Sequence, residues 1–243
     1  LGSPILAKKL IAEIARITPQ KVVAVIVTHY HADHIYGLQE FKKIGATIYA
    51  QGDGRNYLSS ETAKQRLIAS RMDFAPWVNA NTQLVAADVW IDQKTKLNIG
   101  SIEFLVSRVG PAHAPEDLMI YVPSEKVLFA GDLVFRGRIP FVGNADSKGW
   151  LIALDEIEKL KPKINDITKT KTVETKAKRT TVRNLESTNS FLLISVCAGS
   201  SGGKSSPPYR YKPSPCKAIA LTRHRCIEVL ISKALGLVMG LLE

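Results

Sequence analysis

The chain has 243 residues, of which 45% are hydrophobic and 23% are charged, a globular composition that suits one domain, alone or with an appendage, and excludes a fibrous chain. Its net charge of +11 is uneven: residues 1–162 hold 19 Lys and Arg against 17 Asp and Glu (net +2), and residues 163–243 hold 14 against 5 (net +9). The basic character therefore belongs to the last third of the chain.

The first elements alternate between helix and strand. Ser3-Pro4 is typical of a helix start, and apolar residues then recur with helical spacing as far as Ile14. The β-branched run Val22–Val27 indicates a buried strand. A second helix is predicted from about Asp33 to Ile44, and the next strand covers residues 46–50. Together the later three segments predict a β–α–β unit.

The middle of the chain favours strands. Residues 52–82 are predicted to be mostly helical or irregular, and two hairpin-like pairs follow. The predicted strands are Lys96–Asn98, Ile102–Val109, Leu118–Val122 and Lys126–Phe129. A helix over about Ser147–Leu160 follows, with Trp150, Leu151, Leu154, Ile157 and Leu160 assigned to one face. This mixture predicts an α/β fold of layered sheets covered by helices.

Four potential metal ligands lie within six residues, directly after the predicted strand: His29, His31, Asp33 and His34. Zinc prefers imidazole nitrogen and carboxylate oxygen, and a catalytic site keeps one position open for water. Side chains alternate along extended backbone, so His29 and His31 point to the same side and can share a metal. Asp33 and His34 project from the start of the helix toward a neighbouring position. The spacing predicts two metal subsites; the plainer alternative is a surface or helix-capping histidine cluster.

This segment resembles a known signature. Thr28–His34 is similar to the His-x-His-x-Asp-His motif of the metallo-β-lactamase superfamily. Gly110–His113 resembles its third histidine segment, which implies that His113 completes the first site with His29 and His31. Phe129–Asp132 resembles its Gly-Asp segment, which implies that Asp132 bridges two metals.

The resemblance covers residues 1–165, and Ala130–Leu151 is most similar to the quinoprotein-relay-associated zinc hydrolases. It implies an αββα sandwich, here incomplete because the first strands of the family are expected to be missing at a truncated N-terminus. We therefore expect a partial domain over residues 1–165. Residues 166–243 are expected to form a basic, low-complexity, poorly ordered tail.

The resemblance implies a zinc-dependent hydrolase. Zinc lowers the pKa of bound water from 15.7 to about 7, so hydroxide is available to attack an ester, thioester or amide (lactam) carbonyl. Asp33 is the implied catalytic residue, because it would orient the hydroxide as well as ligate the second metal. Redox di-iron members of the superfamily typically carry Glu in place of His31, which favours zinc, with iron as the other candidate.

One departure from the family pattern concerns the second site. The family has a final histidine after the last helix, but Lys161–Asp166 contains none, and His224 stands in a different context and is not assigned as a ligand. The second metal is therefore in doubt. The alternative function is a non-catalytic metal-binding remnant whose basic tail binds anionic partners.

The expected partner is a small-molecule substrate, and nucleic acid is not expected. No membrane span is predicted, because Glu228 and Lys233 interrupt the short apolar segment 226–242. The three cysteines lie in the C-terminal third, at Cys197, Cys216 and Cys226. They do not decide between cytoplasm and periplasm, and the oligomeric state stays open.

Overall fold

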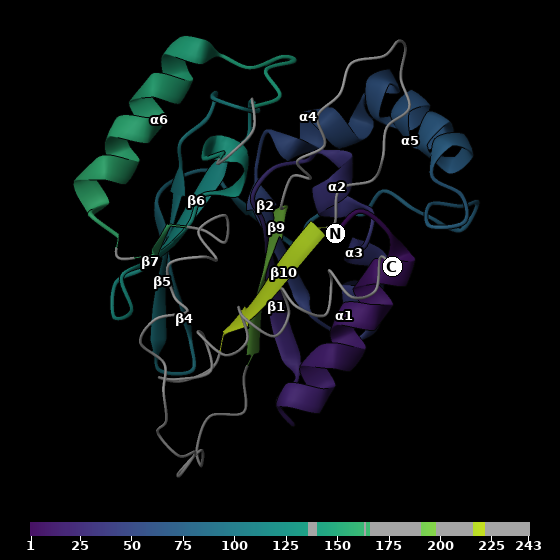
Figure 1. Ribbon diagram of the computed structural model, residues 1–243, viewed down its shortest axis with the longest axis horizontal. Helices are drawn as coiled ribbons and strands as arrows, with labels where there is room; N and C mark the ends of the chain where they lie inside the picture. The colour runs from purple at the N-terminus through teal and green to yellow at the C-terminus, as the bar shows by residue number, and fades with distance from the viewer. Residues whose placement is uncertain (136–139, 163, 166–190, 198–215, 222–243) are drawn as a thin grey trace.

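The computed structural model describes residues 1–135, 140–162, 164–165, 191–197 and 216–221. Two sheets are stacked between helices, with α6 on one outer side and the other helices on the opposite side (Figure 1). The helical elements are α1 (Pro4–Ile17), α2 (Ala32–Ile35), α3 (Leu38–Lys43), α4 (Gly54–Ser59), α5 (Glu61–Asp73), the 3-10 turn η1 (Gly131–Leu133) and α6 (Ser147–Leu160). The predicted α/β sandwich is confirmed.

The first sheet has β1 at its centre. Its strands, in spatial order, are β10 (Cys216–Leu221), β9 (Phe191–Cys197), β1 (Val22–Val27), β2 (Thr47–Gln51) and β3 (Val89–Ile91). Parallel pairing joins β9, β1, β2 and β3, whereas β10 runs antiparallel to β9. The carboxyl end of β1 leads directly into the histidine segment. The helices α2 and α3 then connect this segment to β2, which is parallel to β1.

The second sheet is mostly antiparallel. Its order is β4 (Thr95–Ile99), β5 (Ile102–Arg108), β6 (Leu118–Val122), β7 (Val127–Phe129) and β8 (Ile164–Asn165). The pairs from β4 to β7 are antiparallel, and β8 adds a parallel edge strand. Both predicted hairpins are therefore confirmed, with strand ends that differ from the prediction by no more than one residue.

Three apolar cores separate the layers. The alternation of side chains along β1 sends Val25 and Val27 to the core under α1, α2 and α3, and sends Ala24 and Ile26 to the core between the sheets. A third core lies between the second sheet and α6, where Trp150 is a central residue. The strand β1 is thus buried on both faces, which explains its uninterrupted apolar run.

The predicted helix over residues 33–44 is wrong as one element. It is divided into α2 and α3 at Gly37. A Cβ at Gly37 would lie 2.8 Å from the Cβ of Leu1 and 2.9 Å from that of Ala7. The Gly37 amide also donates to the Leu1 carbonyl oxygen at 2.7 Å. The helix is therefore interrupted where the N-terminal segment and α1 pack too closely against Gly37 to leave room for a side chain.

The bounds predicted for α6 are confirmed, but its predicted buried face is partly wrong. Trp150, Ala153 and Ile157 are buried, whereas Leu151 is 65% exposed. Positions 150, 153 and 157 follow the three- and four-residue steps of a helix face. Leu151 follows Trp150 by one position and therefore points away from that face.

Most of the predicted poorly ordered tail lies outside the described residues, as do His224, Cys226 and the apolar segment 226–242. Two strands within the predicted tail, β9 and β10, belong to the first sheet, and neither was predicted from the sequence. In the described part of the chain, no helix combines the length and apolar character needed to cross a bilayer.

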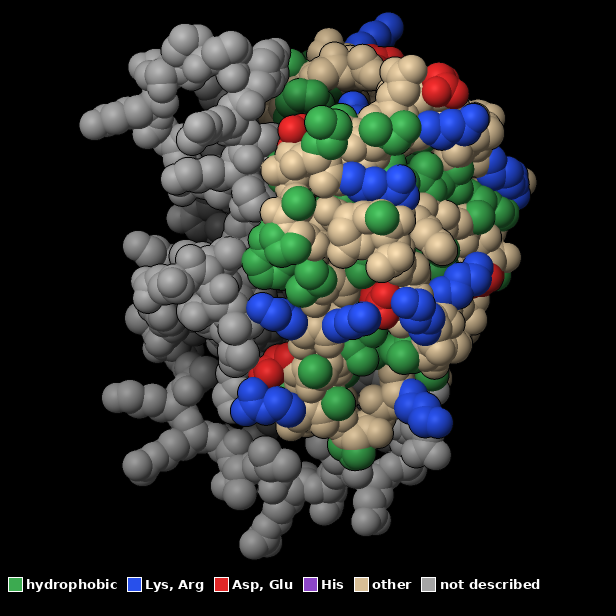
Figure 2. Space-filling model, turned by 90° about the vertical axis from the view of Figure 1, so that its right-hand side faces the viewer, with side chains coloured by type: hydrophobic (Ala, Val, Ile, Leu, Met, Phe, Trp, Pro, Cys, Tyr) green, Lys and Arg blue, Asp and Glu red, His purple; other side chains and the backbone are tan. Residues whose placement is uncertain are grey.

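Charges of both signs occupy the outer side of the helical layer. Figure 2 shows Lys and Arg side chains spread over the side that carries α1 and α5, with Asp and Glu between some of them. Pairs within this layer include Arg16 with Glu13 at 2.9 Å and Lys64 with Glu61 at 3.5 Å. That nucleic acid is not a partner stays a prediction.

Candidate metal centre

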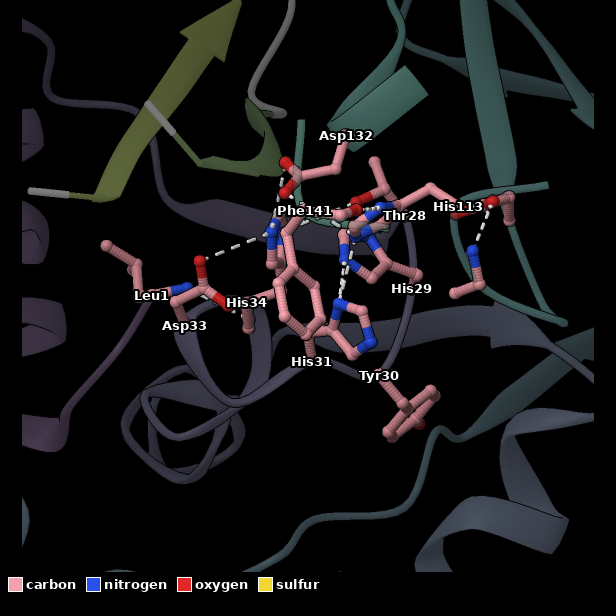
Figure 3. A network of polar contacts seen from close by, with 12 residues as sticks. Leu1, Thr28, His29, Tyr30, His31, Asp33, His34, His113, Asp132 and Phe141 are labelled. Carbon is pink, nitrogen blue, oxygen red and sulfur yellow. Dashed lines mark hydrogen bonds and ion pairs between the residues drawn. The ribbon is translucent and has the colours of Figure 1, made fainter. Parts of the chain in front are cut away.

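The candidate ligands come from both sheets and meet where the sheets join. His29, His31 and His34 follow β1, His113 lies between β5 and β6, and Asp132 lies in η1 after β7. At this junction the amide of Leu118, the first residue of β6, donates to the Thr28 carbonyl oxygen at 2.8 Å. Figure 3 shows these side chains converging from separate segments of the chain.

The first donor group consists of three imidazoles. His31 Nδ1 lies 3.0 Å from His29 Nε2 and 3.0 Å from His113 Nε2. Zinc–nitrogen bonds of about 2.0–2.1 Å in a tetrahedron separate ligand nitrogens by about 3.3 Å. The spacing of this group therefore fits a tetrahedral metal with one position left for another ligand.

The second donor group contains His29, His34 and Asp132, all buried. Asp132 reaches toward both groups: its Oδ1 lies 3.4 Å from His34 Nε2, and its Oδ2 lies 3.6 Å from His113 Nε2. One carboxylate therefore offers an oxygen to each group. This is the geometry that a bridging ligand requires.

Asp33 lies beside the second group. Its Oδ2 is 3.8 Å from His34 Nε2, and its side chain is 33% exposed, compared with 10% for Asp132. From the sequence, Asp33, His34 and Asp132 were expected to form the second site. In the structure, the three residues whose ligand atoms lie within 4.8 Å of one another are His29, His34 and Asp132. Asp33 is therefore the candidate residue that borders both the donors and solvent.

Burial favours the neutral form of His29, His31 and His113. Loss of solvation, reinforced by neighbouring imidazoles, holds the pKa of His29 well below its ordinary value and lowers the pKa of His31 to about 4. Burial also lowers the pKa of His113, although Asp132 opposes this shift. Neutral imidazoles keep the lone pairs that metal ions bind, so this donor set suits a divalent metal at neutral pH.

Partners on the far side of the rings fix their orientation. His113 Nδ1 lies 3.1 Å from the Phe141 carbonyl oxygen, which can only accept a proton, so Nε2 keeps its lone pair toward the other ligands. Thr28 Oγ1 lies 3.2 Å from His29 Nδ1 and 3.3 Å from His34 Nδ1. Carbonyl and hydroxyl partners of this kind orient histidine ligands in metal proteins.

Glu116 joins the two histidine segments and was not identified from the sequence. Its Oε1 accepts from the amide of Tyr30, between His29 and His31, at 2.8 Å. Glu116 is buried, and burial raises the pKa of its carboxyl. Its place three residues after His113 was the only available signal.

Trp150 supports the centre from α6. Its indole Nε1 donates to the Leu133 carbonyl oxygen at 2.8 Å, next to Asp132, and its ring lies 5.3 Å from the imidazole of His113. The sequence identified Trp150 as a core residue but not as a contact of the candidate ligands. It therefore ties the outer helix to both ligand-bearing turns of the second sheet.

Gly131 gives a testable link between the backbone and Thr28. Its φ is +57°, and a Cβ there would lie 2.9 Å from the Cβ of Thr28. Gly45 has a φ of +83°, and a Cβ there would have no other atom within 4 Å, so it is a matched control for backbone strain alone.

We expect Gly45→Ala to cost about 1–2 kcal/mol of unfolding free energy. Gly131→Ala is expected to cost more and also to weaken metal binding. Denaturant unfolding and metal titration measure both; equal behaviour of the two variants would contradict this expectation.

Comparisons with known proteins identify relatives of the described domain. The family profile described as "Metallo-beta-lactamase superfamily" matches residues 1–165. A protein of Elizabethkingia meningoseptica, "Metallo-beta-lactamase type 2", is 24% identical over 148 residues, covering 60% of this chain and 51% of the relative. The Bacillus subtilis (strain 168) protein "Probable metallo-hydrolase YqgX" is 30% identical over 118 residues, covering 48% and 52%.

A solved structure supports the same fold. The crystal structure of metallo-beta-lactamase IND-7 superposes with a TM-score of 0.51 at 22% identity, covering 65% of each chain. The chain spans about half the length of the two curated relatives named above. The family profile includes all the candidate ligands, which lie within residues 1–165.

Proposed function

Because this chain belongs to the metallo-beta-lactamase superfamily, whose profile matches residues 1–165, we propose that it is a metal-dependent hydrolase with a zinc centre. The proposed ligands are His29, His31 and His113 for one metal, and His34 and Asp132 for a second, with Asp33 completing the second set. Residues 1–165 are proposed as the catalytic domain, whose first sheet also includes β9 and β10 from the basic segment 166–243.

The position of Asp132 is the observation that carries this proposal. Its two carboxylate oxygens face different donor groups, toward His34 on one side and His113 on the other. A carboxylate that serves only to pair with one histidine has no need to span two sets of donors. Its buried position beside neutral imidazoles gives it the features expected of a bridging ligand.

A divalent metal at this centre supplies a Lewis acid and lowers the pKa of water toward neutrality. The chain supplies positioning. Asp33 Oδ2 accepts a hydrogen bond from a water that enters at the solvent side and orients it toward the substrate carbonyl. The buried imidazoles exclude bulk water from the opposite side and keep the donor geometry fixed.

The proposed substrate is a small molecule with an ester, thioester or amide (lactam) bond. Phe141 is 60% exposed, and the centroid of its ring lies 6.3 Å from that of the His31 ring and 6.5 Å from that of the His113 ring. An exposed aromatic ring beside the donors favours substrates with an apolar group next to the bond to be cleaved. Phe141 is therefore proposed to contact that group.

Metal content and turnover of the full chain test the proposal together. We expect native mass spectrometry to detect two zinc ions, and a panel of chromogenic lactam, ester and thioester substrates to be cleaved at a rate that chelation abolishes and zinc restores. Less than one metal per chain and no turnover of any substrate would instead support the metal-binding remnant. Bound metal without turnover would refute hydrolysis of these bonds and leave the ligand assignment standing.

A further inference from the structure

We propose that Thr28 is a positioning residue whose single hydroxyl oxygen sets the ligating nitrogen of one histidine in each donor group. The inference rests on the proposed metal centre and adds to it a residue that touches no metal. Thr28 is the first residue after β1, is 1% exposed, and is held by the bond from the Leu118 amide to its carbonyl oxygen.

The distances join this oxygen to two rings. Oγ1 lies 3.2 Å from His29 Nδ1 and 3.3 Å from His34 Nδ1. The two rings stand side by side with centroids 4.0 Å apart. Their other nitrogens lead to different partners: His29 Nε2 faces His31, and His34 Nε2 faces Asp132. Figure 3 shows Thr28 within the same network of polar contacts as these imidazoles.

Hydrogen-bond capacity then restricts the protonation states. A hydroxyl has one proton to donate and two lone pairs to accept, and a neutral imidazole has one N–H. If the hydroxyl donated to either Nδ1, the proton of that ring would lie on Nε2 and block ligation. Both Nε2 atoms carry lone pairs only when both Nδ1–H groups donate to Thr28 Oγ1. One oxygen therefore prepares both groups of donors at once.

Substitution of Thr28 separates this role from packing. Thr28→Val keeps the shape and removes the oxygen, and Thr28→Ser keeps the oxygen and removes the methyl group. By the usual effect of lost ligand partners, we expect Thr28→Val to raise the Kd for zinc about 10–100-fold at both sites and Thr28→Ser to stay within about threefold of the native protein. Thr82 is buried and bonds the Asn79 amide at 3.0 Å, away from the ligands, so Thr82→Val is the control for loss of a buried hydroxyl.

Zinc titration of the full chain against a chromogenic chelator measures both affinities without any turnover assay. Native affinity in Thr28→Val, or a loss confined to one site, would overturn the inference. A native protein that binds no zinc would instead refute the proposed function.

The ring nitrogens can also be observed directly if Thr28→Val does not fold. In the native protein loaded with ¹¹³Cd²⁺, we expect nitrogen NMR spectra to detect protonated Nδ1 and cadmium-coupled Nε2 in both His29 and His34. Coupling of cadmium to Nδ1 of either ring would overturn the inference.

Discussion

His31→Ala is expected to remove the zinc of the first donor group and to lower hydrolysis by about a thousandfold or more, because metal stabilisation contributes several kcal/mol and each 1.36 kcal/mol is tenfold in rate. His31 Nδ1 is the atom that lies 3.0 Å from both His29 Nε2 and His113 Nε2. Its loss therefore removes the nitrogen that is close to both other ligands of the first donor group. Metal content by mass spectrometry and kcat/KM on the best substrate of the panel measure the two effects.

The fifth histidine of the chain provides the control. His224 is not assigned as a ligand, so His224→Ala is expected to keep the metal content and the rate of the native protein. Loss of one zinc from both variants would contradict the assignment of His31 as a distinctive ligand. Native turnover in His31→Ala would contradict the proposed hydrolytic centre itself.

Acid is expected to destabilise the metal-free protein steeply. The pKa of His31 is lowered to about 4 by burial and by His113, and the pKa values of His29 and His113 are lowered too. In the unfolded chain these imidazoles take up protons near pH 6.5. Between about pH 6.5 and 4 the unfolded state binds more protons than the folded state, so stability present above this window is lost as the pH falls.

Two substitutions separate the groups that act in this window. His31→Asn removes a group whose folded pKa is lowered and should make the decline of stability shallower. Asp117 acts in the opposite direction, because burial raises its pKa to about 7 and its contribution is lost as the pH rises. Asp117→Asn should therefore make the decline steeper. Urea unfolding of metal-stripped protein at about pH 7 and about pH 5 measures the slopes; one common slope for all three proteins would refute this account.

Local sequence patterns predicted those elements whose position is determined by their own apolar residues. The apolar run Val22–Val27 identified β1, and the start and end of α6 were correct because Asp146 caps Gly149 and the apolar spacing continues to Leu160. The break at Gly37 was missed because it depends on contacts with Leu1 and Ala7 that no local pattern contains. The strands β9 and β10 were also missed, and they belong to the sheet through long-range pairing, of β9 with β1 and of β10 with β9.

The candidate site followed the same division. The spacing of His29 and His31 predicted a shared group, and the resemblance supplied His113 and Asp132, which the structure brings to the same centre. In the second group His29 stands where the sequence predicted Asp33, because spacing alone does not give the three-dimensional course of the loop after β1. The role of Glu116 depends on a contact across the junction of the sheets, and the role of Thr28 depends on the ring positions of His29 and His34 within one loop, so both required coordinates.

Because the candidate ligands follow strands of two different sheets, an ion bound at the proposed centre would be a reversible cross-link between them. His29 and His31 belong to one half of the sandwich, and His113 and Asp132 belong to the other. An ion that binds only the closed sandwich adds RT ln(1 + [L]/Kd) to its stability, about 4 kcal/mol at a thousandfold excess over Kd. Chelation would therefore lower the free energy of unfolding, and the concentration of free metal would determine how strongly the two sheets are held together.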